Sequence, residues 1–379
     1  MALQPLAAVK RQPRSSPRQA SARDVTAGLA TPLAMGLVAG RRRRRGRPHR
    51  TPAVAGTAEE RIAVDASLRR LDERLERAME AEIADGDKEA MARAEAEAQA
   101  LFEGELQGRL SGFGSAEQLA KREYTLAELQ EQGVEAARLL SPADSTFETV
   151  RRSLLAATSL GGGAFIVAFH PDPMDVVRLA IGGFFAITVD RVVNKGLLEL
   201  LVVDSISRAV NEEYRSRVVQ HEAGHFLVAY LLGLLPKAYT LSSWEALVRF
   251  KSPNVQAGCV FCDAAFQRES ATGSISGRSL DRFICVALAG ASIEYVLFGE
   301  ARGGSSDIQQ IETLLQACGF DQRRASAQVR WAALNTVSIL KRHRDVHRSL
   351  ARVMERGASV GECIAEIERG LAQGAAAVA

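Results

Sequence analysis

The sequence places two histidines four residues apart, with a glutamate directly after the first, in the segment HEAGH. Residues at this spacing share one face of a helix, so the imidazoles of His221 and His225 can reach a single zinc ion. Glu222 can then take a proton from the attacking water, which is the chemistry of peptide-bond hydrolysis. Apolar neighbours such as Val219 and Phe226 favour a buried metal-binding helix. Two core histidines with satisfied hydrogen bonds are the alternative.

A second histidine pair has the same spacing in a different setting. His343 and His347 lie among Arg342, Arg344 and Arg348, and no glutamate follows the first histidine. Extra positive charge opposes the binding of a divalent cation. The sequence therefore predicts a solvated surface for this pair and no metal.

A catalytic zinc needs a third protein ligand and an open fourth position. The metzincin extension of the motif fails, because Val228 and Leu231 stand where a glycine and a histidine are required. Glu245 follows the second histidine at a plausible distance for a third ligand, but its surroundings give little helical support.

Asp307 is the better candidate for the third ligand. Gly303 and Gly304 are expected to turn the chain. Ser305 or Ser306 can cap the N-terminus of the helix that follows, which would have Asp307 in its first turn. An acid at this place can also serve only to stabilise the helix dipole.

The chain from residue 204 onward has the pattern of a compact, mostly helical domain with a small β element. The sequence predicts helices at about 205–232, 280–298, 325–342 and 347–356, and short strands at 238–241, 247–250 and 258–262.

The first 58 residues differ in charge from the rest of the chain. They carry twelve Lys and Arg against a single acid, Asp24, which leaves residues 59–379 at a net charge of about −8. An acid-poor leader rich in Arg, Ser and Ala is typical of a disordered organellar transit peptide. The run RRRRRGRPHR at 41–50 also fits a nucleic-acid patch, but the acidic body disfavours a nucleic-acid partner. We expect the chloroplast, with the mitochondrion as the alternative.

Two helical regions are expected between this leader and residue 204. Residues 59–150 are dense in Ala, Glu and Arg, with leucines at helical steps, and predict a charged helical arm. Residues 151–203 predict an apolar helical hairpin, because its stretches 153–169 and 179–189 contain no charged side chain. A buried hairpin, an interfacial anchor and a membrane-spanning segment all fit this composition.

The five cysteines are odd in number and spread along the chain, which argues against a disulfide framework and favours a reducing compartment. Cys259 and Cys262 form a lone CxxC segment. A structural zinc needs two further ligands, and no second pair follows. Buried residues of a strand are the expected role, and a redox dithiol is the alternative.

Two blocks of the sequence, in this order, resemble the protease domain of the FtsH family. HEAGH is followed by ALAGASIEYVLFGEARGGSSDIQQ at 287–310, where the family pattern has an AGxxAEExxFG helix and a GASxDL turn. The resemblance covers roughly residues 218–367. The segments YLLGLLPKAYTLSS, LDRFICVALAG and AQVRW are similar to the plastid FtsH-like proteins of plants and algae that lack an ATPase domain.

The resemblance implies roles for four residues. His221 and His225 would be zinc ligands, Asp307 the third ligand and Glu222 the general base.

Other positions vary from the family pattern. Glu294 matches the first glutamate of the apolar helix and would hold the ligands in position without binding the metal itself. Tyr295 replaces the second glutamate, and GGSSD replaces GASND.

No GxxxxGK[ST] phosphate loop occurs in the sequence, so ATP-driven unfolding is not expected within this chain. A zinc site alone would hydrolyse segments that are already unfolded or delivered by another machine. The expected function is a zinc metalloendopeptidase of an FtsH-type helical fold, in a homo-oligomer or a hetero-oligomer with an FtsH-type ATPase. A proteolytically inactive adaptor or chaperone-type subunit is the alternative.

Overall fold

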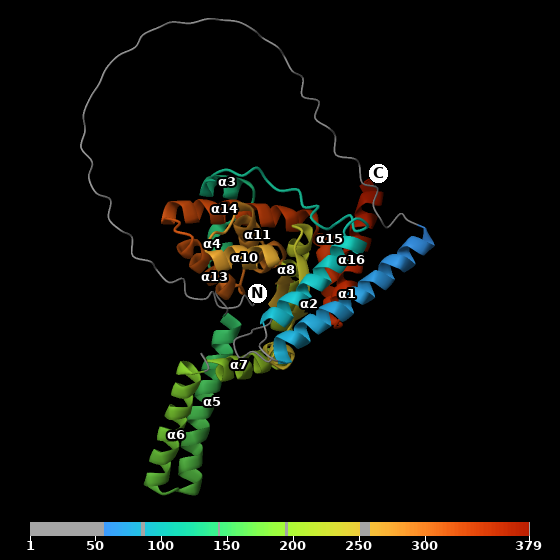
Figure 1. Ribbon diagram of the computed structural model, residues 1–379. Coiled ribbons are helices and arrows are strands. Elements are labelled where there is room, and N and C mark those ends of the chain that lie inside the picture. Colours follow the sequence, from blue (N-terminus) through green and yellow to red (C-terminus); the bar gives the residue numbers. More distant parts are fainter. Residues whose placement is uncertain (1–56, 85–87, 143–144, 194–195, 251–257, 379) are drawn as a thin grey trace, which may run out of the picture.

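The computed structural model describes residues 57–84, 88–142, 145–193, 196–250 and 258–378. These residues form a mainly helical body with one small two-stranded sheet, and a helical hairpin projects from the body (Figure 1). The predicted class, mainly α with a small β element, is confirmed. The leader predicted over residues 1–58 lies outside the described residues, except for its last two positions.

Helix α8 (Glu212–Leu231) runs through the centre of the body and is buried from Val219 onward, apart from Gln220. Its first turn is capped by Asn211, whose side chain accepts a hydrogen bond from the Tyr214 backbone N–H at 3.1 Å. The single helix predicted at 205–232 is therefore wrong, since Asn211 separates two helices. The helices that pack against α8 are α7 (Leu197–Val210), α11 (Gly277–Ala287), α12 (Ala289–Phe298), α14 (Gln322–Arg342) and α15 (Arg344–Glu355).

Strands β1 (Leu235–Thr240) and β2 (Gly258–Cys262) form an antiparallel pair beside α8. The register shifts between Pro236 and Ala238, so Lys237 forms a bulge. A bulge re-aims the side chain of its extra residue. Here the ammonium of Lys237 lies 2.7 Å from Glu95 Oε1, and both side chains are buried.

The strand predicted at 247–250 is wrong, because these residues belong to helix α9 (Ser243–Phe250). The hydroxyl of Ser242 accepts a hydrogen bond from the Glu245 backbone N–H, which is a helix-capping contact. Trp244 and Val248 are exposed, whereas Ala246 is buried, so the segment follows a helical period.

The N-terminal helices α1 (Ala58–Ala84) and α2 (Lys88–Leu101) pack against each other and continue into a π-helical turn at Phe102–Leu106. The C-terminal helix α16 (Val360–Val378) packs on α1. The segment predicted as a charged arm thus contributes to the main core. Core side chains from these parts and from α8 include Leu71, Phe102, Phe226, Leu227 and Ile364.

A second hydrophobic cluster lies on the other side of α12. The predicted helix at 280–298 is divided at Leu288 into α11 and α12, and the predicted tail helices correspond to α14 and α15. The remaining helices of this half are α3 (Leu126–Glu131), α4 (Ala136–Leu140), α10 (Ala264–Thr272) and α13 (Ser305–Ala317).

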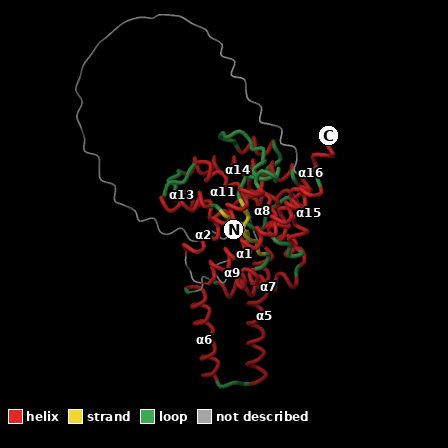
Figure 2. Tube along the Cα trace, turned by 45° about the vertical axis from the view of Figure 1, so that its right-hand side comes forward, coloured by secondary structure: helices red, strands yellow, loops and turns green. Residues whose placement is uncertain are grey.

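Helices α5 (Ser145–Phe169) and α6 (Pro173–Val192) form the projecting hairpin, which contains both predicted apolar stretches (Figure 2). Helix α7 runs across the base of the hairpin and joins it to α8 (Figure 1). Among the described residues, one helical segment, Thr149–Phe169, is long and apolar enough to cross a membrane, and none of it is buried.

Candidate metal centre

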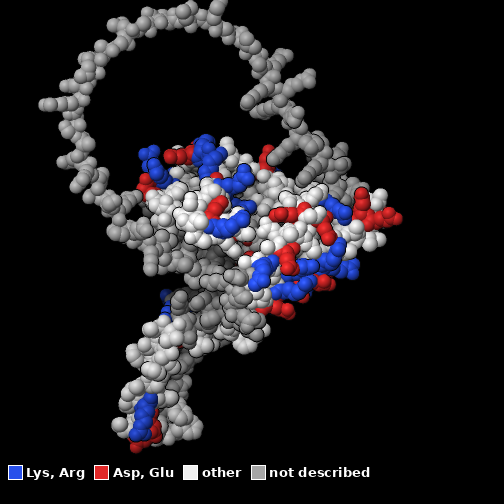
Figure 3. All heavy atoms as spheres, viewed as in Figure 1, with Lys and Arg blue, Asp and Glu red and all other residues white. Residues whose placement is uncertain are grey.

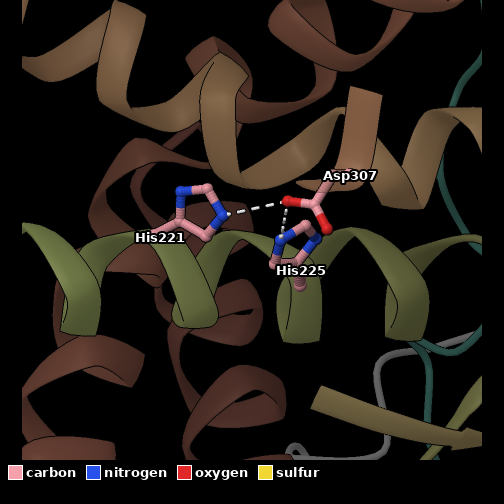
Figure 4. Close-up of side chains that lie close together, drawn as sticks. All are labelled: His221, His225 and Asp307. Atoms are coloured by element: carbon pink, nitrogen blue, oxygen red, sulfur yellow. Dashed lines mark hydrogen bonds and ion pairs between the residues drawn. The ribbon is translucent and has the colours of Figure 1, made fainter. Parts of the chain in front are cut away.

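Helix α8 presents both predicted histidines on one side (Figure 4). The ring centroids of His221 and His225 are 4.8 Å apart, as expected for side chains one helical turn apart. Gly224 lets α12 approach this helix closely. A Cβ atom on Gly224 would lie 2.7 Å from Ile293 Cγ2 and 2.9 Å from the Ala289 carbonyl oxygen.

Asp307 lies in the first turn of α13 and faces the two histidines (Figure 4). Its Oδ2 atom is 3.3 Å from His221 Nε2 and 3.4 Å from His225 Nε2. The residue before the helix is Gly304, whose φ of +96° is in the left-handed region that favours glycine. The expected serine cap is wrong, because Gly304 occupies the cap position and no side chain caps the helix.

The three side chains could hold a metal ion, and two of the distances among their ligand atoms match those around a zinc ion. Ligands about 2.0–2.1 Å from a tetrahedral zinc lie about 3.3–3.4 Å from one another. The two distances from Asp307 to the histidines match this value, and the three ligand atoms all lie within 4.8 Å of one another. Two imidazoles with one carboxylate leave the fourth position for a reactant, as in catalytic sites.

Hydrogen bonds at the Nδ1 atoms orient both histidine rings. His225 Nδ1 lies 2.7 Å from the Val286 carbonyl oxygen, and His221 Nδ1 lies 2.7 Å from Glu294 Oε1. Because a carbonyl oxygen only accepts, the proton of His225 is on Nδ1. With Nδ1 of His221 held in the same way by the Glu294 carboxylate, the Nε2 atoms of both rings are directed toward Asp307. Metal-binding histidines are held in this way.

Glu294 is itself fixed by several donors. Its Oε2 atom accepts from the Arg302 backbone N–H at 2.9 Å, and the Gly303 N–H lies 3.2 Å away. The Arg217 guanidinium lies 3.4 Å from the same oxygen. The support role that the resemblance implied for Glu294 therefore has a geometric basis, whereas Arg217 and Arg302 were not predicted. Arg217 precedes His221 by one helical turn, which was an available signal.

The carboxylates dominate the electrostatics around His221. Burial lowers the pKa of His221, but its hydrogen bonds to Asp307 and Glu294 raise the pKa to about 10. Burial raises the pKa of Asp307, yet this pKa is lowered overall, in part by His225 and His221. The pKa of Glu294 is also lowered, against burial, by His221 and the backbone donors. The cluster therefore favours a positive charge at its centre.

Glu222 is buried beside the ligand set on the same helix. Its Oε2 atom has no hydrogen-bond partner among the described residues, and neither does His225 Nε2. Buried polar atoms without partners are rare in folded proteins and mark places where a ligand or water binds. The backbone carbonyl of Glu222 accepts a weak hydrogen bond from the Cys259 thiol at 3.4 Å.

Glycines form a tight wall around His221 that sequence analysis did not identify. A Cβ atom on Gly290 would lie 2.1 Å from His221 Nε2, and one on Gly303 would lie 2.7 Å from Glu294 Oε1. The run of small residues at 289–292 was the available signal for this close approach.

Glu245, the other candidate for the third ligand, does not join the histidines. Glu245 Oε2 accepts a hydrogen bond from the Leu241 backbone N–H at 2.8 Å, and Glu245 does not belong to the metal-ligand cluster of the described residues. Asp307 occupies the position beside the histidines instead.

The CxxC segment lies in strand β2, where Cys259 and Cys262 are buried. Residues three apart along a strand are about 10 Å apart, beyond the reach of a disulfide. Burial raises the pKa of Cys262 to about 12 and raises that of Cys259 well above its usual range, so both thiols stay protonated. This geometry fits the expected role of the two cysteines as buried residues of a strand. It does not fit a redox dithiol.

The second histidine pair corrects one prediction. His347 is fully buried, and its Nε2 atom lies 2.9 Å from the Gln220 carbonyl oxygen, so the predicted surface position is wrong. Burial lowers the pKa of His347 to about 4, and the charge of Arg348 adds to this shift. His347 is buried because it packs against α8, which is distant in sequence, although its neighbours in the sequence are charged.

No protein-family model matches the chain, and no curated protein or solved structure is significantly similar to it. The functional interpretation therefore depends on the geometry of the site.

Proposed function

We propose that the chain is a zinc-dependent metalloendopeptidase of the FtsH type. The observation that carries this proposal is the 3.3–3.4 Å spacing of Asp307 Oδ2 from both histidine Nε2 atoms, beside the buried Glu222 carboxylate. A bound Zn²⁺ ion supplies a Lewis acid and an activated water nucleophile.

The residues of the chain divide the remaining tasks. His221, His225 and Asp307 hold the ion, and Glu294 keeps the His221 ring in position through the 2.7 Å contact at Nδ1. Glu222 takes a proton from the attacking water and returns one to the leaving amine. Its Oε2 atom suits this task, because no described group engages it by a hydrogen bond.

The substrates we propose are unfolded or delivered protein segments. The sequence contains no GxxxxGK[ST] phosphate loop, so the unfolding work would come from a partner such as an FtsH-type ATPase. The acid-poor leader supports import into a chloroplast, with the mitochondrion as the alternative.

The test compares the full chain with Glu222→Gln. Zinc would be measured by elemental analysis, and cleavage would be followed on an unfolded fluorescent casein, alone and with an FtsH-type ATPase. We expect about one zinc per chain in both proteins and at least about a 100-fold lower cleavage rate in the variant, because a general base contributes about 10²–10⁴-fold.

A second function is favoured by the burial of the ligands. His225 is 0 % exposed and Asp307 3 %. A described hollow of ≈ 430 Å³, lined in part by Tyr124 and Lys341, contains none of the ligands. Such closure suits a structural metal in a non-proteolytic adaptor or chaperone-type subunit. Full zinc occupancy with equal, negligible cleavage by wild type and Glu222→Gln would establish this second function and reject the peptidase.

A further inference from the structure

The α5–α6 hairpin exposes an extended apolar surface. Along Thr149–Phe169 no part is buried, and the large apolar side chains of both helices are exposed. Soluble proteins rarely expose contiguous apolar patches of this kind without a partner. The exposed side chains include Leu160, Val167, Phe169, Leu179, Phe184 and Ile187.

The length of the hairpin and the position of its charges fit a lipid bilayer. Helices of 25 and 20 residues are about 38 and 30 Å long, against ~30 Å for the hydrocarbon core of a membrane. Among the described helices, only α5 is apolar enough along its length to cross the core by itself. Helix α6 has an uncharged stretch of about 17 Å and spans the core when Arg178 and Arg191 extend their long side chains toward the two headgroup layers. The stretches 153–169 and 179–189 carry no charge. Charged side chains gather instead at the free end, where Arg178 pairs with Asp175 at 2.7 Å (Figure 3).

Helices α7 and α9 extend the apolar surface across the base of the hairpin. The exposed positions of α7 include Leu198 and Val202, one turn apart, and none of its exposed positions is charged. Helix α9 contacts α7 and exposes Trp244 (61 %) and Val248 (59 %), again one turn apart. Tryptophan is favoured at membrane–water interfaces, where its indole nitrogen stays hydrated.

Polar contacts fix the angle between the hairpin and α7. The buried Asp190 of α6 accepts hydrogen bonds from the Leu198 and Glu199 backbone N–H groups at 3.0 and 3.3 Å, so it caps the first turn of α7. Glu199 pairs with Arg151 of α5 and Arg191 of α6. The hairpin therefore meets α7 in a defined geometry, with Arg151 and Arg191 at the level of α7.

We propose that this surface binds a lipid bilayer. The α5–α6 hairpin spans the hydrocarbon core, α7 and α9 lie in the interface on the side of the body, and the turn at 170–172 reaches the opposite face. Arg151 and Arg191 then lie near the lipid headgroups, which favour cations. Full insertion follows from Asp172 and Arg178, because a hairpin that ended inside the bilayer would bury these charges in hydrocarbon.

The first experiment places the free end relative to the bilayer. The full chain with Met174→Cys would be reconstituted into phosphatidylcholine–phosphatidylglycerol vesicles and treated with a membrane-impermeant maleimide. The exposed Cys318 of the body is the internal reference, since the other four cysteines are buried.

For a spanning hairpin, the labelled fractions of Cys318 and the new cysteine are complementary in intact vesicles, and both sites are labelled fully after detergent. Equal labelling in intact vesicles, or release of the chain by alkaline carbonate, overturns the proposal. A lipid-free oligomer whose free end is already protected from the maleimide would identify a second copy as the partner and also overturn it.

The second experiment tests the interfacial helices. The chain has two tryptophans, and Trp331 is 3 % exposed, so quenching by brominated lipids reports on Trp244. We expect stronger quenching by bromines near the headgroups than by bromines at the bilayer centre. Val248→Asp should weaken the quenching at least twofold, whereas Leu126→Asp, at a 62 % exposed apolar position of α3, should leave it unchanged. Absence of quenching, or equal effects of the two variants, overturns the placement of α9.

Discussion

The chain contains two histidine pairs with the same i, i+4 spacing, and they differ in every other respect. His221 and His225 lie on one continuous helix, with Asp307 3.3 and 3.4 Å from their Nε2 atoms. His343 ends α14 with a φ of −110°, and His347 lies in the next helix. The second pair therefore does not lie on one helical face, although its spacing in the sequence suggests that it does.

The environment of each ring explains the difference further. Both rings of the first pair have an acceptor at Nδ1, so both Nε2 atoms are directed to one point. His347 uses Nε2 for the Gln220 carbonyl and has Arg348 as a nearby charge. Spacing alone thus does not make a metal site. Carboxylates and correctly oriented rings are also required.

The largest expected effect comes from removing one histidine of each pair. His225→Ala should lower zinc affinity more than about 100-fold, because it removes a ligand whose ring is already oriented. His347→Gln should retain the affinity within about threefold, since the described hydrogen bond of His347 is to a backbone carbonyl of α8 and to no metal ligand. Competition with a chromophoric chelator measures both constants. Equal losses in the two variants, with circular dichroism reporting intact folds, would contradict the contrast between the pairs.

An intermediate effect is expected from Glu294→Gln. The amide retains an acceptor for His221 Nδ1 but removes the charge that faces Arg217 and the two backbone donors. Loss of such a supporting carboxylate weakens metal affinity about 10- to 100-fold.

The neighbouring substitution Tyr295→Phe is the matched control, because the Tyr295 hydroxyl contacts Gly133 and Glu135 and no ligand. Zinc affinity unchanged in Glu294→Gln would show that the His221 ring is held by packing alone.

The smallest effect concerns the pH dependence of folding. His347 has a folded-state pKa of about 4 against 6.5 in the unfolded chain, so the unfolded state binds more protons between these values. Stability is then lost as the pH falls from about 6.5 to 4, by about 1 kcal/mol at pH 5.5.

Urea unfolding of wild type and His347→Gln at pH 7.5 and 5.5 measures this contribution. The wild type should lose about 1 kcal/mol more than the variant on acidification, since glutamine does not titrate. An equal loss in both proteins would place His347 in contact with water.

The sequence was informative where the relevant contacts are local. The spacing of His221 and His225 follows from helix geometry, and the turn before Asp307 follows from the left-handed backbone that glycine favours, although the predicted serine cap is wrong. The structure brings the three residues together. The glycine wall was not foreseen. Gly290 matters only because α12 packs on α8, and no local pattern reports which helices touch.

Errors in the fold prediction also have physical causes. Asn211 stops a helix in the middle of a helix-favouring run, because its side chain satisfies the Tyr214 N–H of the next helix. Residues 247–250 have strand-forming residue types, yet tertiary contacts favour helix α9. His347 has charged neighbours in sequence but is covered by α8 in space.

The buried ion pair between Lys237 and Glu95 limits how the chain can be shortened for laboratory work. A fragment beginning near residue 204 would keep the ammonium of Lys237 inside the protein and delete the Glu95 carboxylate, which lies 2.7 Å from it. Removing one partner of a buried ion pair costs about 3–5 kcal/mol, a large share of the stability of a typical domain. Expression designs should therefore begin no later than α1, since α1 and α2 complete the interior around α8.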